Sequence, residues 1–372
     1  MHIADITMFW TPSSGGVRTF LEAKDAWLAK QAGIRHTLLV PGATATCAGA
    51  HMTLPAPSIP FGHGYRFPLR RQTWVEHLLE LAPDIIEAGD PYVLAWAALQ
   101  AGRRLQVPAV GFYHSDLPRL VGSRAGQWTN RWLNAYIARL YRHFDRVLAP
   151  SHVMANKLRS LGVERVFVQP LGVDPVQFNP CYRDPAVRRE LGLDDATRLL
   201  IFAGRGSHEK NLPVLLQTMT LLGKGFHLHL VGSCLPDRLP DNVSKTDCFL
   251  GRQQLARWLA SSDALVHAGD RETFGLIVLE AMASGIPVVG VQAGAVAELV
   301  VPGTGLLARS LSAESLAWSV RALFADGWRE TGRRARLQVE QHYTWQRVLP
   351  QLIGHYQELT GQGLAIPEVR FG

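Results

Sequence analysis

The sequence predicts an α/β protein made of two Rossmann-like domains, each with a doubly wound parallel sheet. Apolar runs of strand length alternate with amphipathic stretches of helix length along the whole chain, which is typical of parallel sheets covered by helices on both faces. The 372 residues exceed what one hydrophobic core usually serves. A cluster of proline and glycine near the middle supplies a boundary between two such domains.

The first domain is predicted over residues 1–170. Its expected strands are the apolar runs at residues 3–9, 36–40, 84–88, 109–113, 146–149 and 166–169. The domain ends at Pro170-Leu171-Gly172-Val173-Asp174-Pro175, because two prolines around a glycine interrupt the periodicity there.

The second domain is predicted over residues 171–345. Its expected strands lie at residues 199–203, 227–231, 264–267, 287–291 and 306–308. A last helix, at about 346–360, has too few partners in an already complete second sheet. We therefore expect the C-terminal segment 346–372 to cross back onto the first domain.

Positive charge is concentrated in the first domain. Residues 1–170 carry 18 Lys and Arg against 11 Asp and Glu, whereas residues 171–372 carry 20 of each. This predicts either that the first domain meets an anionic partner, such as a lipid surface or an anionic acceptor, or that the arginines simply keep it soluble. No recognised motif accompanies the arginines, so we expect no nucleic-acid partner.

The cysteines and the N-terminus point to the cytoplasm. The four cysteines form no CxxC pair, which argues against a zinc site and a disulfide framework. The chain begins without a basic leader and contains no apolar run of about 18 residues. We expect a cytoplasmic protein without a transmembrane helix, either soluble or peripheral on the inner face of the cell membrane.

Two glycines, Gly15 and Gly16, separate the first strand from a helix that begins near Val17. Glycines at this place let backbone amides approach an anion at the helix N-terminus. The G-x-G-x-x-G spacing of dinucleotide-binding proteins is absent. The pair therefore indicates either an anion contact or a structural turn.

A cationic pair follows the first strand of the second domain. Arg205 and Lys210 lie between this strand and the next helix, at the carboxyl edge where open α/β sheets bind ligands. Arg offers a bidentate fork to phosphate oxygens and Lys a mobile point charge, which together suit a diphosphate. The alternative is that both are solvated and one of them pairs with Glu209.

Two carboxylates flank a helix start further along. Glu272 lies in the loop after residues 264–267, and Glu280 lies about 8 Å beyond the helix start near Phe274 and Gly275. Free amides at this start favour a phosphate, and carboxylates accept hydrogen bonds from sugar hydroxyls. Glu280 is costly to bury unpaired, so either a ligand hydroxyl pair or a salt bridge on the helix face must account for it.

An ordered set of motifs carries a family resemblance. The motifs are Gly204-Arg205-x4-Lys210-Asn211, Glu272-Thr273-Phe274-Gly275-Leu276-x3-Glu280-Ala281, Ser284-Gly285-Ile286-Pro287-Val288-Val289 and Gly303-x-Gly305-Leu306-Leu307. This set resembles the retaining glycosyltransferases of family four, which have the GT-B fold. The resemblance extends to Gly15-Gly16-Val17 and to the segment before the boundary, so it covers nearly the whole chain.

The resemblance implies a role for each residue of the set. Arg205 and Lys210 would hold the donor diphosphate, with a backbone contact from Gly16 of the first domain, and Glu272 would lie against the donor sugar. Glu280 would bind the ribose hydroxyls. The amides of Phe274, Gly275 and Leu276 would touch the sugar or the phosphates. The family uses no metal in such sites, so we expect neither a metal nor another cofactor.

His114 ends an apolar strand of the first domain, in Gly111-Phe112-Tyr113-His114-Ser115-Asp116. The resemblance carries a catalytic-site histidine onto this position, where it would orient or stabilise the sugar without acting as a base. Taken alone, a histidine at a strand end is more often structural. Asp116 and Asp90 are further candidates, and either could cap a helix instead.

Residues 124–146 read as one amphipathic helix. The apolar arc is expected to hold Trp128, Trp132, Leu133, Tyr136, Ile137, Leu140, Tyr141 and Phe144, and the opposite arc Arg124, Arg131, Arg139, Arg142 and Arg146. The segment is either an ordinary core-packing helix or a peripheral contact with an anionic membrane.

These residues together predict a metal-independent retaining hexosyltransferase that forms an α-linkage to a glycan or a lipid-linked acceptor. The stretch Tyr113-His114-Ser115-Asp116-Leu117-Pro118 is similar to that of mannosyltransferases that use GDP-mannose. GDP-mannose is therefore the first expected donor and a UDP-hexose the second. The alternatives are a nucleotide-sugar epimerase of the same fold and a non-catalytic binding subunit.

Overall fold

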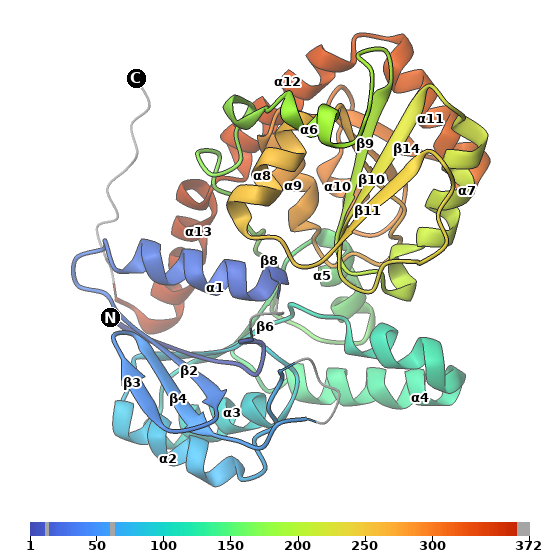
Figure 1. The fold of residues 1–372 in the computed structure, drawn as a ribbon. Helices are drawn as coiled ribbons and strands as arrows, with labels where there is room; N and C mark the ends of the chain where they lie inside the picture. The colour runs from blue at the N-terminus through green and yellow to red at the C-terminus, as the bar shows by residue number, and fades with distance from the viewer. Residues whose placement is uncertain (12–14, 60–63, 363–372) are drawn as a thin grey trace. The chain divides into compact units, whose positions relative to one another are not determined.

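The chain divides into two compact units (Figure 1). The computed structural model describes residues 1–11, 15–59 and 64–362, without the side chains of residues 119–127. The first unit comprises Met1–Pro170 and Val348–Gly372, and the second comprises Leu171–Arg347. Each unit has its own sheet and its own hydrophobic core.

The first unit is built on a sheet of eight strands in the order β3-β4-β2-β1-β5-β6-β7-β8. The strands are β1 (His2–Ile6), β2 (Arg35–Gly42), β3 (Thr46–Ala48), β4 (His51–Pro55), β5 (Ile85–Ala88), β6 (Ala109–Phe112), β7 (Arg146–Ala149) and β8 (Val166–Val168). All neighbouring pairs are parallel except β3 and β4. The sheet is therefore parallel, as predicted, with one antiparallel edge strand that the sequence reading missed.

Helices cover both faces of this sheet. They are α1 (Gly15–Leu28), α2 (Arg71–Leu81), α3 (Val93–Leu105), α4 (Leu117–Tyr141), α5 (His152–Ser160) and α13 (Trp345–Thr360). Figure 1 shows α2 and α3 on one face of the strands and α1 on the other. Because successive side chains of a strand point to opposite faces, each strand here contributes to both layers.

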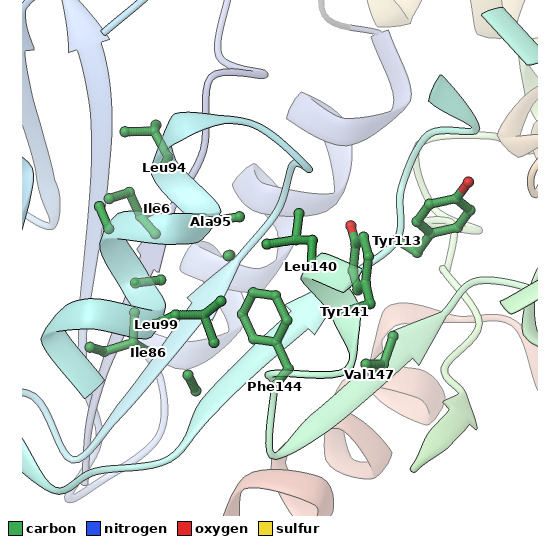
Figure 2. Close-up of a cluster of buried hydrophobic side chains, with 14 of the residues drawn as sticks. Ile6, Ile86, Leu94, Ala95, Leu99, Tyr113, Leu140, Tyr141, Phe144 and Val147 are labelled. Carbon is green, nitrogen blue, oxygen red and sulfur yellow. The ribbon is translucent and has the colours of Figure 1, made fainter. Parts of the chain in front are cut away.

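The core on one side of the first sheet is continuous from β1 to β7. Ile6 of β1 and Ile86 of β5 lie with Leu94 and Leu99 of α3 in one buried cluster. Figure 2 shows Leu140, Tyr141, Phe144 and Val147 joining this cluster from the end of α4, from the connection that follows it and from β7. The last turn of α4 is thereby anchored to the sheet.

A buried charged network lies on the opposite side, where Asp5 and Glu87 alternate with these apolar residues. Lys24 of α1 is fully buried, and its Nζ lies 2.8 Å from Asp5 Oδ1 and 3.0 Å from Glu87 Oε1. The same amine donates to the hydroxyl of Tyr356 in α13 at 2.8 Å. His36 of β2 lies 3.0 Å from the second oxygen of Asp5. The network ties α1, three strands and the C-terminal helix together, and nothing in the sequence reading identified it.

The second unit has a fully parallel sheet of six strands in the order β11-β10-β9-β12-β13-β14. The strands are β9 (Arg198–Ala203), β10 (Phe226–Gly232), β11 (Val243–Asp247), β12 (Ala264–His267), β13 (Val288–Val291) and β14 (Gly305–Ala308). The helices are η1 (Pro180–Tyr182), α6 (Ala186–Glu190), η2 (His208–Lys210), α7 (Leu212–Leu222), α8 (Arg252–Ser261), α9 (Leu276–Ala283), α10 (Val296–Leu299), α11 (Ala313–Ala325) and α12 (Trp328–His342). Figure 1 shows α7 and α11 on one face, and α8 and α9 on the other.

The sequence reading missed β3 and β4, which lie at one end of the first sheet, and β11, which forms an edge of the second. Residues of β3 are exposed throughout, β4 buries only Leu54, and β11 buries only Val243. Edge strands need no continuous apolar run, because one of their sides faces solvent. The expected strands are found in the interior of the two sheets and at their other edges.

The structure corrects the prediction for residues 124–146. Helix α4 ends at Tyr141, and Arg146 opens β7, where its guanidinium contacts Glu358 at 2.7 Å. Trp128 and Trp132 were expected on the apolar arc opposite the arginines, but they are 88% and 69% exposed. A helical wheel with 3.6 residues per turn places them beside Arg131 and Arg139 instead. Arg124 lies outside the residues whose side chains are described.

No helix in the described part of the chain is both long and apolar enough to cross a membrane.

Candidate functional site

The strand order of the second sheet reverses between β9 and β12. The strands β10 and β11 lie on one side of β9, and β12, β13 and β14 lie on the other. Loops that leave the carboxyl ends of two such strands diverge, and open α/β sheets bind ligands in the crevice between them. Lys210 lies in the loop after β9 and Glu272 in the loop after β12. The predicted cationic and acidic residues therefore meet at one edge of the sheet.

Glu272 is held between a lysine and a histidine. Lys210 Nζ forms an ion pair with Glu272 Oε1, and His267 Nε2 lies 3.1 Å from the same oxygen. The amide of Gly269 donates to His267 Nδ1 at 3.2 Å, so we infer that a neutral His267 carries its proton on Nε2, toward the carboxylate.

These partners decide the charge of Glu272. Burial by itself raises its pKa, but the charge of Lys210 and the contact with His267 outweigh burial and hold the pKa well below the ordinary value. Glu272 is therefore an ionised hydrogen-bond acceptor at physiological pH. The sequence reading did not assign His267, although its place at the end of a predicted strand, five residues before Glu272, was a usable signal.

Asn211 joins the two loops behind this cluster. Its side-chain amide donates to the carbonyl of Ala268 at 2.9 Å and to Asp270 Oδ1 at 3.0 Å. Its backbone adopts the left-handed conformation, with φ of 52°, between η2 and α7. The loop that carries Lys210 is thus fixed to the loop that carries Glu272.

Arg205 lies on the same loop as Lys210, directly after Gly204, and its side chain is exposed. The sequence analysis left open that Arg205 or Lys210 pairs with Glu209, and the structure answers this for Lys210. Lys210 pairs with Glu272, whereas the carboxylate of Glu209 accepts a hydrogen bond from the hydroxyl of Ser207. The structure thus brings Lys210 and Glu272 into direct contact and places Arg205 on the same loop as Lys210.

The start of α9 presents an anion-binding backbone close to this cluster. Gly275 precedes the helix with φ of 94°, a left-handed conformation that favours glycine, and Leu276 is the first helical residue. The first amides of a helix have no intrahelical acceptor, and the helix dipole adds positive potential there. Phe274 is buried, with its ring centroid 6.4 Å from that of Tyr343 in an edge-to-face contact.

Glu280 lies in the second turn of α9. Its surroundings raise its pKa, whereas those of Glu272 lower the pKa of that residue. Burial raises the pKa of Glu280 to about 7, and the charge of Arg252 offsets this only in part. Within the described residues, the Glu280 carboxyl forms neither a hydrogen bond nor an ion pair. The Glu280 carboxyl, which is partly protonated near pH 7, therefore has oxygen atoms that can accept a hydrogen bond from a ligand hydroxyl.

The two candidates in the first unit have different surroundings. Gly16 is exposed in the first turn of α1, directly after Gly15. The ring of His114 is buried and stacked on Phe112 at 3.9 Å, and burial together with the charge of Lys24 lowers its pKa to about 3. His114 is therefore a neutral imidazole at physiological pH. That these residues share a site with Lys210 and Glu272 stays a prediction.

Asp116 and Asp90 both have partners that fix the local structure. Asp116 forms an ion pair with Lys157 of α5. Asp90 accepts the amide of Met8 at 2.6 Å and that of Tyr92 at 3.0 Å, and burial raises its pKa to about 6. These contacts support a structural role for both carboxylates, which fix the local loops. This role is similar to the helix capping that the sequence analysis gave as the alternative.

Across the described ranges, no three His, Cys, Asp or Glu side chains gather in an arrangement that could hold a metal ion.

Comparison with protein families gives two matches that together cover most of the chain. Residues 14–177 match the family described as "Glycosyltransferase Family 4". Residues 197–326 match the family described as "Glycosyl transferases group 1".

Two curated proteins are similar over long stretches. A GDP-mannose-dependent alpha-mannosyltransferase of Mycolicibacterium smegmatis is 34% identical over 75% of this chain and 75% of its own length. A GDP-mannose-dependent alpha-(1-6)-phosphatidylinositol dimannoside mannosyltransferase of Mycobacterium tuberculosis is 30% identical over 95% of both chains.

Solved structures share the fold. Sucrose-phosphate synthase from Thermosynechococcus elongatus superposes with a TM-score of 0.76 at 20% identity, over 97% of this chain and 99% of that one. HepE from Anabaena, in complex with UDP-glucose, gives 0.75 at 20% identity over 96% and 100%. The predicted GT-B fold class is thereby confirmed.

Proposed function

The chain belongs to glycosyltransferase family 4 and is a hexosyltransferase, and on that basis we propose that it transfers mannose from GDP-mannose to a glycan or lipid-linked acceptor. The transfer retains the anomeric configuration and gives an α-linkage. The cluster of Lys210, Glu272 and His267 at the switch point of the second sheet is the observation that carries this proposal. The two relatives named for GDP-mannose support the choice of donor.

Different residues of the second unit bind different parts of the donor. Lys210 and the exposed Arg205 bind the diphosphate, assisted by the first amides of α9. The ionised Glu272 accepts hydrogen bonds from hydroxyls of the donor sugar, and its pair with Lys210 keeps that amine at the phosphate. Glu280, one turn into α9, accepts the ribose hydroxyls.

The chemical step breaks the bond between the anomeric carbon and the diphosphate oxygen, while the acceptor oxygen attacks from the same face. The proton of the acceptor hydroxyl passes to the departing phosphate oxygen, so the enzyme needs no separate base. Fixed cationic groups stabilise the charge that develops on the leaving diphosphate. His114, neutral in its buried setting, stabilises the sugar as a hydrogen-bonding group, and Gly16 contributes a backbone contact to the phosphates.

Hydrolysis of GDP-mannose in the absence of acceptor tests this assignment. Lys210→Ala and Glu272→Ala should lower GDP release on the order of a hundredfold, since each removes a group that contacts the reacting end of the donor. Lys224→Ala, which changes an exposed lysine of the same unit, is the matched control and should retain full activity. Chelation by EDTA should leave the rate unchanged, because fixed charges replace a metal.

Thermal shifts with GDP, UDP and ADP test the donor separately. A nucleotide at about 100 times its Kd stabilises the protein by about 2.7 kcal/mol, and we expect GDP to give the largest shift. A larger thermal shift with UDP would indicate that the donor is a UDP-hexose rather than GDP-mannose. A clear shift with GDP but no turnover of any donor, alone or with candidate acceptors, would favour a non-catalytic binding subunit.

A further inference from the structure

We propose that the outer face of α4 docks onto an anionic lipid surface, with two tryptophans entering the interface and three arginines binding lipid phosphates. This face consists of Trp128, Trp132, Arg131, Arg139 and Arg142 and is called the α4 face below. The inference does not depend on which donor the protein uses. It proposes where the protein meets its acceptor, namely at a lipid surface, which the family assignment does not supply.

Two tryptophans of the α4 face are largely exposed to solvent. Trp128 is 88% exposed and Trp132 is 69% exposed, one turn apart on the same side of α4. Trp132 stacks on the half-buried Tyr136, with ring centroids 6.2 Å apart. The side of the helix that faces the core is already filled by Leu133, Ile137, Leu140 and Tyr141. The tryptophans therefore contribute little to the core of this unit, and most of their apolar surface is exposed to water.

Arginines occupy the rest of the same face. Arg131, Arg139 and Arg142 line a surface recess of about 470 Å³ together with Asn134, Ala138 and Leu161. Arg142 is held in place by the carbonyls of Leu161 at 3.0 Å and Gly162 at 2.9 Å. Arg131 and Arg139 form no ion pair with any carboxylate of the described residues. The recess thus concentrates fixed positive charge beside exposed aromatic rings.

This combination is complementary to a lipid surface. Tryptophan prefers the boundary between headgroups and acyl chains, because its ring is apolar and its indole N–H is polar. Guanidinium groups pair with lipid phosphates in a bidentate manner and are attracted to anionic membranes. All of the net positive charge of the chain falls within residues 1–170, the region that holds this face. The structure gives this unit an amphipathic contact surface and no transmembrane helix among the described residues.

Co-sedimentation of the full chain with phosphatidylcholine vesicles, with and without phosphatidylglycerol, tests the proposal. The wild-type chain should bind vesicles that contain phosphatidylglycerol at low salt and lose most binding at high salt. Arg131→Gln with Arg139→Gln should lower this partitioning by about 30-fold, corresponding to about 1 kcal/mol for each charge. Trp128→Ala with Trp132→Ala should lower it on the order of tenfold through the loss of apolar contact.

Two matched controls separate the α4 face from general properties of the chain. Arg103→Gln with Arg104→Gln removes the same charge from exposed positions at the end of α3, and Trp318→Ala removes a tryptophan that is 67% exposed in the second unit. Both should bind vesicles within about twofold of wild type if the α4 face makes the contact. A thermal shift with GDP, measured for every variant, reports folding and donor binding independently.

Three results would overturn the proposal. The first is a lack of binding to phosphatidylglycerol vesicles at low salt. The second is an equal loss in the α3 arginine control, which would make net charge rather than this face responsible. The third is a homopolymer RNA that displaces the vesicles from the α4 face. Failure of GDP-mannose turnover would leave the membrane contact standing, so the two proposals fail separately.

Discussion

Two glutamates eight residues apart differ in charge because their neighbours differ. Glu272 has Lys210 and His267 against its carboxylate, which hold its pKa low, whereas burial raises the pKa of the half-buried Glu280 to about 7 and the charge of Arg252 offsets this only in part. Environments that separate two pKa values in this way assign different roles to identical side chains. Glu272 acts as a permanent anion, and Glu280 changes charge near neutral pH.

The raised pKa of Glu280 predicts a pH dependence of stability. Between its ordinary value of 4.5 and about 7, the folded protein keeps a proton that the unfolded chain has released. The free energy of unfolding therefore falls as pH rises through this interval, by roughly 3 kcal/mol for this group. Glu280→Gln removes this contribution, so the variant should gain stability relative to wild type between about pH 5 and about pH 8.

Urea unfolding of both proteins at the two pH values measures the difference. Glu314→Gln, an exposed glutamate at the start of α11, serves as the control and should show no such change with pH. A difference between wild type and Glu280→Gln that is the same at both pH values would contradict the assignment. Under the proposed role of Glu280 in binding the two ribose hydroxyls, which its ionised form accepts best, GDP affinity of the wild type should also rise with pH across the same interval.

At the scale of elements, two strand ends come close enough to shape the site. Gly232, the last residue of β10, faces Gly204, the residue before Arg205, and a Cβ added at Gly232 would lie 1.8 Å from the Gly204 carbonyl oxygen. Gly232 also has φ of 148°, which a side chain rarely adopts. The close approach of β9 and β10 therefore sets the path of the loop that carries Arg205 and Lys210.

Gly232→Ala should displace this loop and weaken GDP binding by more than it weakens the fold. We expect the GDP-induced thermal shift to fall, with a loss of affinity on the order of tenfold, because a misplaced cation loses its contact with phosphate. Gly225→Ala, next to the opposite end of β10, has open space around the added methyl group and is the control. Equal GDP affinity in both variants would show that the strand-end contact does not position the loop.

At the scale of the molecule, the C-terminal helix is part of the first unit. The hydroxyl of Tyr356 in α13 accepts a hydrogen bond from Lys24 and donates to Glu87, so residues 332 positions apart share one network. The pKa of Lys24 is raised, because its interactions with Asp5 and Glu87 outweigh the cost of burial. Lys24 therefore stays charged, and the network joins α1, which carries Gly16, to the strands and to α13.

Lys24→Met should therefore be strongly destabilising. Removing the lysine leaves Glu87 buried without a cation and leaves Asp5 with only His36, at a cost of roughly 3–5 kcal/mol in the free energy of unfolding. Lys30→Met, which changes an exposed lysine just after the same helix, should have an effect below about 0.5 kcal/mol. Urea unfolding of the two variants compares them, and similar midpoints would refute the role of the network.

The sequence by itself determined the fold class, most strands of both sheets and the family. These features depend on local apolar periodicity and on motifs with fixed spacing, which can be read along the chain. It also located Lys210 and Glu272 at the carboxyl ends of their strands, because that edge follows from the order of strand and loop.

Only the tertiary structure decided which side chains meet. The pairing of Lys210 with Glu272, the contact from His267 and the burial of Lys24 depend on residues that lie far apart in the sequence or on neighbouring strands. The sequence analysis assigned Trp128 and Trp132 to the apolar arc of α4, whereas helical periodicity of 3.6 residues per turn places them beside the arginines and the packed unit leaves them exposed. The physical reason is that local patterns specify elements, while burial and charge pairing are properties of the assembled layers.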